Sequence, residues 1–330
     1  MKPIKSIMIT LCVACLSTLL ILPVTASNNS GVNLYATNVN IKANEWMKSL
    51  NDTLLIRHLS LPGTHDSGAM WGGEALRTQS STFSQQLETG IRAFDVRLQS
   101  HNGKLGVYHS TAFQHIFWEE DVLPTMISFL KNHPTEMLVV SLKCEGGSSN
   151  EYSSLLSASL QQTQYHPYII SSYTNKLTLG DCRGKILFLH RDEVGPNYHG
   201  ARCEDWQDDA SCLLNLRAPD GVISTVYLQD EYQYLSGDIA ELKKKEKAII
   251  HYFEQMSCPT INSSSWGISF ISATGLPHGT PHLFANYLNR SIADYLINHP
   301  QRYCGIILID FVASTEGLRL VNAIIRCNNW

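Results

Sequence analysis

The 330-residue sequence lacks several features that mark out large classes of protein. It has no excess of positive charge, because 25 lysine and arginine residues stand against 29 aspartate and glutamate residues, for a net charge of −4. The chain therefore has no basic footprint of the kind that nucleic-acid-binding domains carry, and no nucleic acid partner is expected. It also has no internal repeat and no linker-like stretch, so we expect one folded domain.

Beyond residue 26 the sequence has no apolar run long enough to cross a bilayer. Before that point, Lys2 and Lys5 precede a mostly apolar run over residues 7–22, and small residues follow at 24–26. This order is typical of a secretory signal peptide, with a retained membrane anchor as the alternative. We therefore expect a secreted protein in which residues 1–26 are a signal peptide, residues 27–44 a polar leader and residues 45–330 the folded domain.

Cysteines are few and lack the spacing of a metal site. Seven remain after residue 26, and no two of them form a Cys-x-x-Cys pair, so a structural zinc site is not expected. An exported chain can form disulfides. We expect Cys203 to pair with Cys212 across a short acidic loop, with Cys304 and Cys327 as the second candidate pair.

What the chain does have is a series of short apolar runs that are rich in valine and isoleucine and show little alternation, a pattern typical of strands buried on both faces. Helix-like segments over residues 122–132, 153–163, 238–254 and 284–298 separate many of these runs. The order predicts a single distorted TIM (β/α) barrel, with a doubly wound open sheet as the structural alternative. The runs cover residues 59–61, 91–96, 105–108, 137–142, 186–189, 222–228, 268–271 and 306–309.

Ionisable side chains stand at or just after the ends of most of these runs. In a parallel barrel the carboxyl ends of the strands open on one face, where such barrels place their active sites. A single ionisable residue at a strand end has a structural explanation about as readily as a functional one, whereas a whole set of them favours function. The set comprises His65, Asp66, Asp95, Arg97, His109, Lys143, Glu145, Arg191, Asp230, Tyr232 and Asp310.

The composition of this set indicates a substrate. Arginine and lysine suit a phosphate group, which arginine can bind through two parallel hydrogen bonds. Carboxylates suit the hydroxyl groups of a sugar or polyol. Two histidines suit proton transfer near neutral pH, where imidazole serves as both base and acid. Together these residue types predict chemistry on a phosphodiester that carries a polyol.

The motifs that hold these residues resemble those of the bacterial phosphatidylinositol-specific phospholipases C. Ser60-Leu-Pro-Gly-Thr-His-Asp-Ser-Gly68 is similar to the opening motif of that family, and Ile91-Arg-Ala-Phe-Asp-Val-Arg97 is similar to its second. The segments 107–110, 140–145, 183–191, 228–232 and 307–310 then follow in the family's order. The resemblance covers residues 45–325, and it implies a distorted TIM barrel and a two-step reaction.

The resemblance also implies roles for individual residues. His65 would be the general base that deprotonates the inositol 2-hydroxyl, and Asp310 would orient it and favour its protonated form. His109, with Asp66, would protonate the departing diacylglycerol oxygen, and Arg97 would stabilise charge on the phosphate. The remaining predicted residues would bind the headgroup: Lys143, Arg191 and Asp230 would hold inositol hydroxyls, Tyr232 would stack on the ring, and Glu145 could support Lys143. His101 and His115 are the alternatives to His109.

Arg97 also bears on cofactors. Calcium-dependent relatives carry an acidic ligand where this motif supplies an arginine, and a guanidinium beside the phosphate would repel a cation. We therefore expect no metal and no other cofactor. Two other functions remain open: a metal-dependent glycerophosphodiester phosphodiesterase, which would need a carboxylate cluster where Asp95-Val96-Arg97 stands, and a non-catalytic inositide-binding protein.

The expected partner is an inositol phospholipid in a membrane surface, met by peripheral contact of a monomer. Trp71, Trp266 and Leu276 lie near predicted strand ends and could insert shallowly into the bilayer, although aromatic residues in such positions are commonly part of the core. Lys243–Lys245 and Lys247 share one predicted helix. We expect them to form a solvated face, with a patch for anionic lipid as the alternative.

Overall fold

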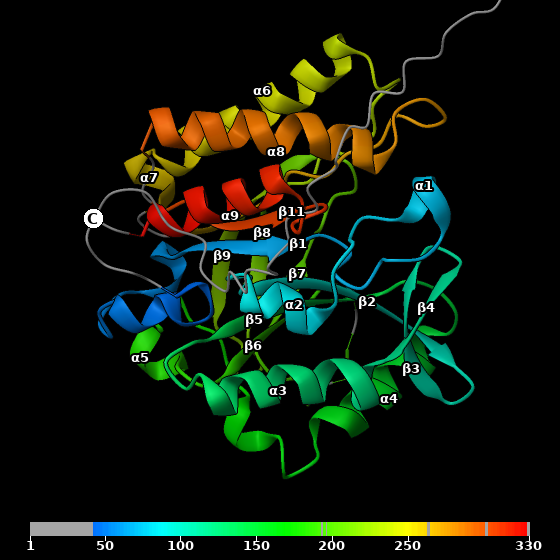
Figure 1. Ribbon diagram of the computed structural model, residues 1–330. Coiled ribbons are helices and arrows are strands. Elements are labelled where there is room, and N and C mark those ends of the chain that lie inside the picture. The colour runs from blue at the N-terminus through cyan, green and yellow to red at the C-terminus, as the bar shows by residue number, and fades with distance from the viewer. Residues whose placement is uncertain (1–41, 193, 196, 263–264, 301–302, 329–330) are drawn as a thin grey trace, which may run out of the picture. The chain divides into compact units, whose positions relative to one another are not determined.

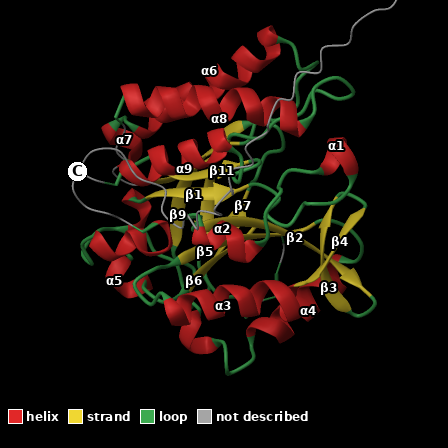
Figure 2. Cartoon of the chain, in the orientation of Figure 1, coloured by secondary structure: helices red, strands yellow, loops and turns green. Residues whose placement is uncertain are grey.

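The computed structural model describes residues 42–328 except 193, 196, 263–264 and 301–302, so the predicted signal peptide lies outside the described residues. In this part of the chain, nine strands form a barrel that is closed by pairing between its first two strands (Figure 1, Figure 2). The prediction of a single distorted TIM barrel is confirmed. The strands are β1 (Ser60–Thr64), β2 (Ala93–His101), β5 (Leu138–Cys144), β6 (Ile186–His190), β7 (Ala201–Glu204), β8 (Ser211–Arg217), β9 (Ile223–Gln229), β10 (Ser265–Phe270) and β11 (Gly305–Ile309).

Strands β1, β6, β10 and β11 are buried at every position, and in β6 and β11 this burial on both faces accompanies a nearly continuous apolar sequence. The point of closure needs a residue without a side chain. Gly63 of β1 lies opposite Ala93 of β2, and a Cβ atom at position 63 would come within 2.8 Å of the Ala93 Cβ. Glycine therefore permits the close approach of backbones that closes the ring.

Helices pack around the barrel, and Figure 1 shows α8 beside α6 and α9 on one side with α3 and α4 on the other. Their ends follow local sequence rules. The side chains of Thr82, Asp238, Thr280 and Ser314 cap α2, α6, α8 and α9 respectively. The helices are α1 (Gly73–Leu76), α2 (Phe83–Glu88), α3 (Leu123–Asn132), α4 (Ser149–Leu160), α5 (Leu179–Cys182), α6 (Ile239–Met256), α7 (Pro259–Asn262), α8 (Pro281–Asn298) and α9 (Thr315–Arg326), with short 3₁₀ or π turns η1 (Ala43–Ser49), η2 (Ile56–His58), η3 (Trp118–Val122) and η4 (His166–Tyr168).

The barrel is distorted between β6 and β9. Strand β8 runs antiparallel to both β7 and β9, whereas β5, β6 and β7 are mutually parallel. The segment around Cys203–Cys212 belongs to β7, β8 and the loop between them, and its strands are part of the barrel wall. Its Leu213 and the following turn residue Val222 are among the exposed large apolar side chains.

The predicted disulfide between Cys203 and Cys212 is wrong, and both residues are thiols. Cys203 of β7 lies opposite Leu216 of β8. Cys212 stands four residues from Leu216 along β8, which at the rise of a β-strand is about 13 Å. A disulfide requires Cα atoms within about 7 Å of each other, so the register of the two strands keeps this pair apart.

Cys304 and Cys327 do lie together. Both are buried, Cys304 at the start of β11 and Cys327 at the end of α9, and a hydrogen bond between the two thiols helps to raise the pKa of Cys304 well above its usual value. The neighbouring Asn328 and the backbone of Cys304 both hydrogen-bond Ser60. A disulfide between these two cysteines stays a prediction.

The run over residues 105–108 is not a barrel strand, contrary to the prediction. It belongs to β3 (Lys104–His109), which pairs antiparallel with the end of β2 and with β4 (Ala112–Phe117). The reason is the intervening turn: Asn102 and Gly103 have φ values of 54° and 78°, as a two-residue hairpin turn requires. The end of β2 and β3 thus form a hairpin that extends from the barrel, and His109 is the last residue of β3.

The amino-terminal end of the barrel holds a buried ion pair. Arg92, just before β2, and Glu136, just before β5, are fully buried, and Arg92 Nη2 lies 2.8 Å from Glu136 Oε2. Arg92 also donates to the carbonyls of Leu87 and Ile91, and the backbone N–H of Met47 in η1 donates to Glu136. These contacts fasten the segment before β1 to the base of the barrel.

Replacing Glu136 with Gln should lower the free energy of unfolding by about 3–5 kcal/mol, because it leaves the Arg92 charge buried without a counter-charge. Denaturation in urea, followed by circular dichroism, measures the change. Glu120→Gln removes a carboxylate from an exposed ion pair with Lys104 and is the matched control, for which little change is expected. Equal destabilisation by the two substitutions would contradict the importance of the buried pair.

Candidate active site

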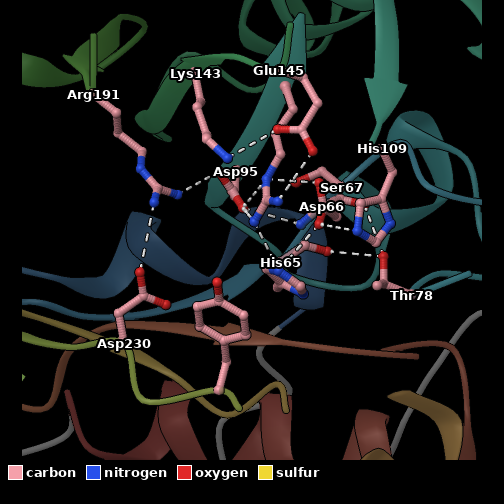
Figure 3. A network of polar contacts seen from close by, with 12 residues as sticks. His65, Asp66, Ser67, Thr78, Asp95, His109, Lys143, Glu145, Arg191 and Asp230 are labelled. Atoms are coloured by element: carbon pink, nitrogen blue, oxygen red, sulfur yellow. Dashed lines mark hydrogen bonds and ion pairs between the residues drawn. The ribbon is translucent and has the colours of Figure 1, made fainter. Parts of the chain in front are cut away.

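The barrel brings the predicted residues together at the carboxyl ends of its strands. His65 and Asp66 follow β1, Asp310 follows β11, Arg191 follows β6, and Asp230 follows β9. Asp95 and Arg97 lie within β2, Lys143 lies near the end of β5, and His109 ends β3. Figure 3 shows most of this set, namely His65, Asp66, Asp95, His109, Lys143, Arg191 and Asp230, within one network of hydrogen bonds and ion pairs.

Arg97 is the centre of this network. Its guanidinium lies 2.8 Å from Asp66 Oδ1, 3.2 Å from Asp95 Oδ2 and 3.5 Å from Glu145 Oε1. Burial alone would lower the pKa of Arg97, but Asp66 and Asp95 raise it above its usual value. Burial alone would likewise raise the pKa of Asp95, which Arg97 and Arg191 instead hold well below its usual range. The arginine is therefore a permanent cation held by carboxylates.

Asp66 occupies a strained turn that aims its carboxylate at both histidines. Its φ of 40° is unusual for a residue with a side chain, and such strain is common at functional sites. Two buried side chains hold the turn: the Thr78 hydroxyl donates to the Asp66 carbonyl at 3.1 Å, and the Gln79 amide donates to the His65 carbonyl at 3.0 Å. Sequence reasoning missed Thr78 and Gln79, since neither belongs to a motif.

The partners of His65 set it up as a base. Its Nδ1 lies 2.8 Å from Asp310 Oδ1, and its Nε2 lies 3.0 Å from Arg97 Nη2. A guanidinium can only donate, so Nε2 must accept and therefore carries a lone pair, while Nδ1 carries the proton. Burial and the charge of Arg97 hold the pKa of His65 well below its usual value. His65 is thus neutral and able to accept a proton.

The partners of His109 set it up as an acid. Its Nδ1 lies 2.5 Å from the Leu76 carbonyl oxygen, and its Nε2 lies 3.3 Å from Asp66 Oδ2. Both partners can accept a hydrogen bond, so each ring nitrogen of His109 has a partner to which it can donate when it carries a proton. The alternative histidines are engaged elsewhere on the hairpin: His101 stacks on Phe113 and His115 packs against Trp71.

Asp66 joins the two histidines. Its Oδ2 lies 3.1 Å from His65 Nε2 and 3.3 Å from His109 Nε2, and the two imidazole centroids are 6.4 Å apart. Burial raises the pKa of Asp66 to about 6. Arg97 and His109 oppose this rise, and the ionised carboxylate lies close enough to accept a hydrogen bond from either Nε2 atom when that atom carries a proton.

The other side of the network holds the residues predicted to bind a polyol. Lys143 Nζ donates to Glu145 Oε2 at 3.0 Å, so Glu145 does contact Lys143 as well as Arg97. Arg191 bridges two carboxylates, with its nitrogens 3.6 Å from Asp95 Oδ1 and 3.6 Å from Asp230 Oδ2. Burial raises the pKa of Asp230, whereas Arg191 lowers it.

A loop that sequence reasoning left without a role reaches this side of the site. Residues 205–210 connect β7 to β8, and the Trp206 ring centroid lies 3.8 Å from the Arg191 guanidinium carbon. The Trp206 indole also donates to Asp230 at 3.0 Å, and the Tyr232 hydroxyl donates to Asp208 at 3.1 Å. The only sequence signal was a tryptophan in an acidic stretch, whose position in space depends on the register of β7 and β8.

The arrangement can transfer two protons across a phosphodiester. The imidazoles of His65 and His109 lie on either side of a shared carboxylate, with a guanidinium beside them to stabilise charge on phosphate oxygens. Carboxylates and cations further along the mouth can bind hydroxyl groups. All eleven residues of the predicted set lie in or next to this network, although their individual roles remain predictions.

Comparisons with known proteins agree with this geometry. A family model described as phosphatidylinositol-specific phospholipase C, X domain, matches residues 69–192. The chain is 29% identical to 1-phosphatidylinositol phosphodiesterase from Listeria monocytogenes, over 82% of each protein. The solved structure of phosphatidylinositol-specific phospholipase C from Listeria monocytogenes has a TM-score of 0.70 and 26% identity, covering 88% of this chain and 100% of that one.

The fold is shared more widely. A mutant of the Staphylococcus aureus phosphatidylinositol-specific phospholipase C has a TM-score of 0.74 at 20% identity, and the similarity covers 86% of this chain and 98% of that one. The resemblance predicted from the motifs is therefore confirmed.

The charge and tautomer expected for His65 can be tested directly. At pH 6, His65 should be neutral with its proton on Nδ1, because burial and Arg97 hold its pKa well below the usual value. Imidazole ¹⁵N chemical shifts report both the charge and the tautomer. In Arg97→Met the opposing positive charge is gone, so the pKa should rise and more of His65 should be protonated at pH 6.

Lys104→Met, which removes an exposed positive charge from the hairpin, is the matched control and should leave His65 unchanged. A fully protonated His65 in the wild type at pH 6 would contradict the assignment.

Proposed function

We propose that the chain is a member of the family of phosphatidylinositol-specific phospholipases C, and that it cleaves the glycerol–phosphate bond of inositol phospholipids to give diacylglycerol and 1,2-cyclic inositol phosphate. The observation that carries the proposal is the opposite preparation of two histidines around Asp66 and Arg97. His65 Nε2 accepts from a guanidinium and so can take a proton, whereas both ring nitrogens of His109 face acceptors, so its Nε2 can hold a proton to give.

In the first step, His65 Nε2 takes the proton of the inositol 2-hydroxyl, and that oxygen attacks the neighbouring phosphorus. The bond from phosphorus to the glycerol oxygen breaks, and His109 Nε2 gives its proton to that oxygen. Because the nucleophile belongs to the substrate, a well-oriented complex gains an effective molarity of about 10⁵ M or more. Asp310 orients His65, and Arg97 stabilises the charge on the phosphate oxygens.

The first step leaves His65 protonated and His109 neutral. In a second step, His109 can take a proton from water, which attacks the phosphorus of the cyclic phosphate, while His65 protonates the departing 2-oxygen. This reversal returns both histidines to their starting states. The shared contact with Asp66 suits both steps, since its Oδ2 lies within 3.3 Å of either Nε2.

The headgroup would be held by the other side of the network. Lys143, Arg191 and Asp230 offer charged donors and acceptors for inositol hydroxyls, and Tyr232 offers a ring on which the inositol can stack. Arg191 and Asp230 are already fixed by Trp206, and Tyr232 by Asp208, so little ordering is needed on binding.

We infer that the reaction needs no metal ion. Among the described residues, one group of three brings potential metal ligands within 4.8 Å of one another: His65, Asp66 and Asp95. Arg97 contacts all three, at 3.0 Å, 2.8 Å and 3.2 Å respectively. The guanidinium thus occupies the position in which a cation would be bound, and it supplies the positive charge beside the phosphate.

We further propose that the protein is exported and acts as a monomer on membrane surfaces. Lys2, Lys5 and the apolar run after them support export, and no helix among the described residues is long and apolar enough to span a bilayer. Trp71 follows β1 and Leu276 follows β10, so both lie on loops at the catalytic end of the barrel, and both are strongly exposed. Trp266, by contrast, is fully buried in β10, which agrees with the alternative that it belongs to the core.

The reaction can be tested by phosphorus NMR on phosphatidylinositol vesicles in excess EDTA. The wild type should produce a cyclic phosphate signal, and His65→Ala should reduce its rate by about 10²–10⁴-fold, the usual contribution of a general base. His101→Ala is the control, since that histidine stacks on the hairpin. A wild-type signal that needs added Ca²⁺ would refute metal independence, and a linear phosphate formed without the cyclic one would refute attack by the 2-hydroxyl.

Membrane contact can be separated from catalysis with Trp71→Ala. Loss of an exposed indole from the active face should weaken sedimentation with phosphatidylinositol vesicles while leaving hydrolysis of soluble 1,2-cyclic inositol phosphate within about twofold. Leu213→Ala removes a similarly exposed apolar side chain from the barrel wall and should affect neither. Equal losses of vesicle binding and soluble turnover in Trp71→Ala would reject the role.

A further inference from the structure

Helix α6 carries four lysines that the sequence predicted to form a solvated face, but one of them is buried. Lys243, Lys244 and Lys247 are exposed, whereas Lys245 has no exposed surface. The prediction is therefore wrong for Lys245. A fully buried ammonium group is costly unless it has hydrogen bonds and counter-charges, so its surroundings must supply both.

The contacts of Lys245 lie on either side of a single residue of the candidate active site. Its Nζ donates to the Glu231 carbonyl at 2.5 Å. The amide of Gln229, oriented so that its nitrogen donates to the Phe270 carbonyl, also accepts from Lys245 Nζ at 2.9 Å. Lys245 therefore hydrogen-bonds to the two residues that flank Asp230, at positions 229 and 231. The Asp230 carboxylate points toward Arg191.

The charges that face Lys245 come from several elements. They are Asp230 and Glu231 after β9, Asp310 after β11, and Asp209 in the loop after β7. Its own helix adds Glu241 and Lys244, which pair with each other. Burial lowers the pKa of Lys245 to about 8, and Asp230 opposes that shift more than any other charge. The ammonium group of Lys245 therefore adds a positive charge near the site from helix α6, which lies outside the strands of the barrel.

We propose that Lys245 is a positioning residue, which fixes the backbone around Asp230 and stabilises its ionised form, and so sets the affinity for the inositol headgroup. The proposal rests on the function proposed above. Asp230 needs such support because it is buried, and its other cationic partner, Arg191, lies 3.6 Å away and is shared with Asp95. Lys245 touches no reacting atom, so it should act on headgroup binding rather than on the chemical step.

The test is the KM and kcat of Lys245→Met for phosphatidylinositol in mixed micelles with a neutral detergent. KM at pH 7 should rise about tenfold while kcat stays within about twofold, because ground-state and transition-state binding of the headgroup are lost equally. Lys247→Met, on the exposed side of the same helix, is the matched control and should keep wild-type values. An unchanged KM in Lys245→Met overturns the proposal.

The pH dependence separates positioning from a merely structural role. In the wild type, KM should rise between pH 7 and pH 9 as Lys245 loses its proton, since its pKa is about 8. Lys245→Met should instead show a high KM that does not change over that range. A wild-type KM that stays constant from pH 7 to pH 9 overturns the proposal, and this measurement needs no variant to fold.

A double-mutant cycle tests whether Lys245 acts through Asp230. Lys245→Met combined with Asp230→Asn should have the KM of Asp230→Asn alone, and Asp230→Asn alone should lose the alkaline rise in KM. Additive increases overturn the coupling. Wild-type turnover is measured first: no cleavage of phosphatidylinositol overturns the proposed function and this inference with it, whereas normal turnover with an insensitive Lys245→Met overturns the inference alone.

Discussion

The site depends on one guanidinium, that of Arg97, which is largely buried, so water screens its charge only weakly. Arg97 is held by Asp66, Asp95 and Glu145, and each of these carboxylates also contacts a second functional group. Asp66 faces both histidines, Asp95 binds Arg191, and Glu145 binds Lys143. Burial of any one of these charges alone would cost a large desolvation free energy, which the mutual attraction of the whole set offsets. Removal of one member therefore leaves several others without a partner, which ties proton transfer to headgroup binding.

The same guanidinium makes the two histidines different. They share Asp66, yet Arg97 donates to His65 only, while His109 faces a backbone carbonyl. Base and acid are thus distinguished by their hydrogen-bond partners rather than by the residue type. Perturbed titration of buried groups in a barrel mouth is the usual sign of a functional site. Here burial is the largest influence on each pKa, and the charged neighbours that add to it or oppose it can be named.

Sequence alone predicted much of the site because strand ends converge. His65, Asp95 and Asp310 belong to different strands, but parallel strands in a closed barrel bring their carboxyl ends to one face wherever they lie in the chain. The resemblance of the surrounding motifs to those of a known family then predicted a role for each residue. His109 was found by its order along the chain, although the strand assigned to it was wrong, since an Asn-Gly turn had made a hairpin there.

What the sequence did not reveal depends on contacts between distant segments. Trp206 and Lys245 reach Asp230 from a loop and a helix whose own sequences show no sign of it. Conversely, Trp266 and Cys203 sit in sequence that suited a membrane contact and a disulfide, yet strand register buries the first and separates the second from Cys212. Local sequence limits which residues can be near a strand end, and packing decides which of them face the site.

The hairpin of β3 and β4 has a consequence for how such a protein can change. Arg97 lies in the closed wall of the barrel and His65 directly follows one of its strands, whereas His109 ends β3, which the Asn102-Gly103 turn folds back antiparallel to the end of β2. Shortening that hairpin would remove His109 while leaving the ring of strands closed by β1 and β2. A protein without this hairpin would lack the proposed acid but keep the residues proposed to bind the headgroup, so the fold allows binding of inositol lipids to be separated from their cleavage.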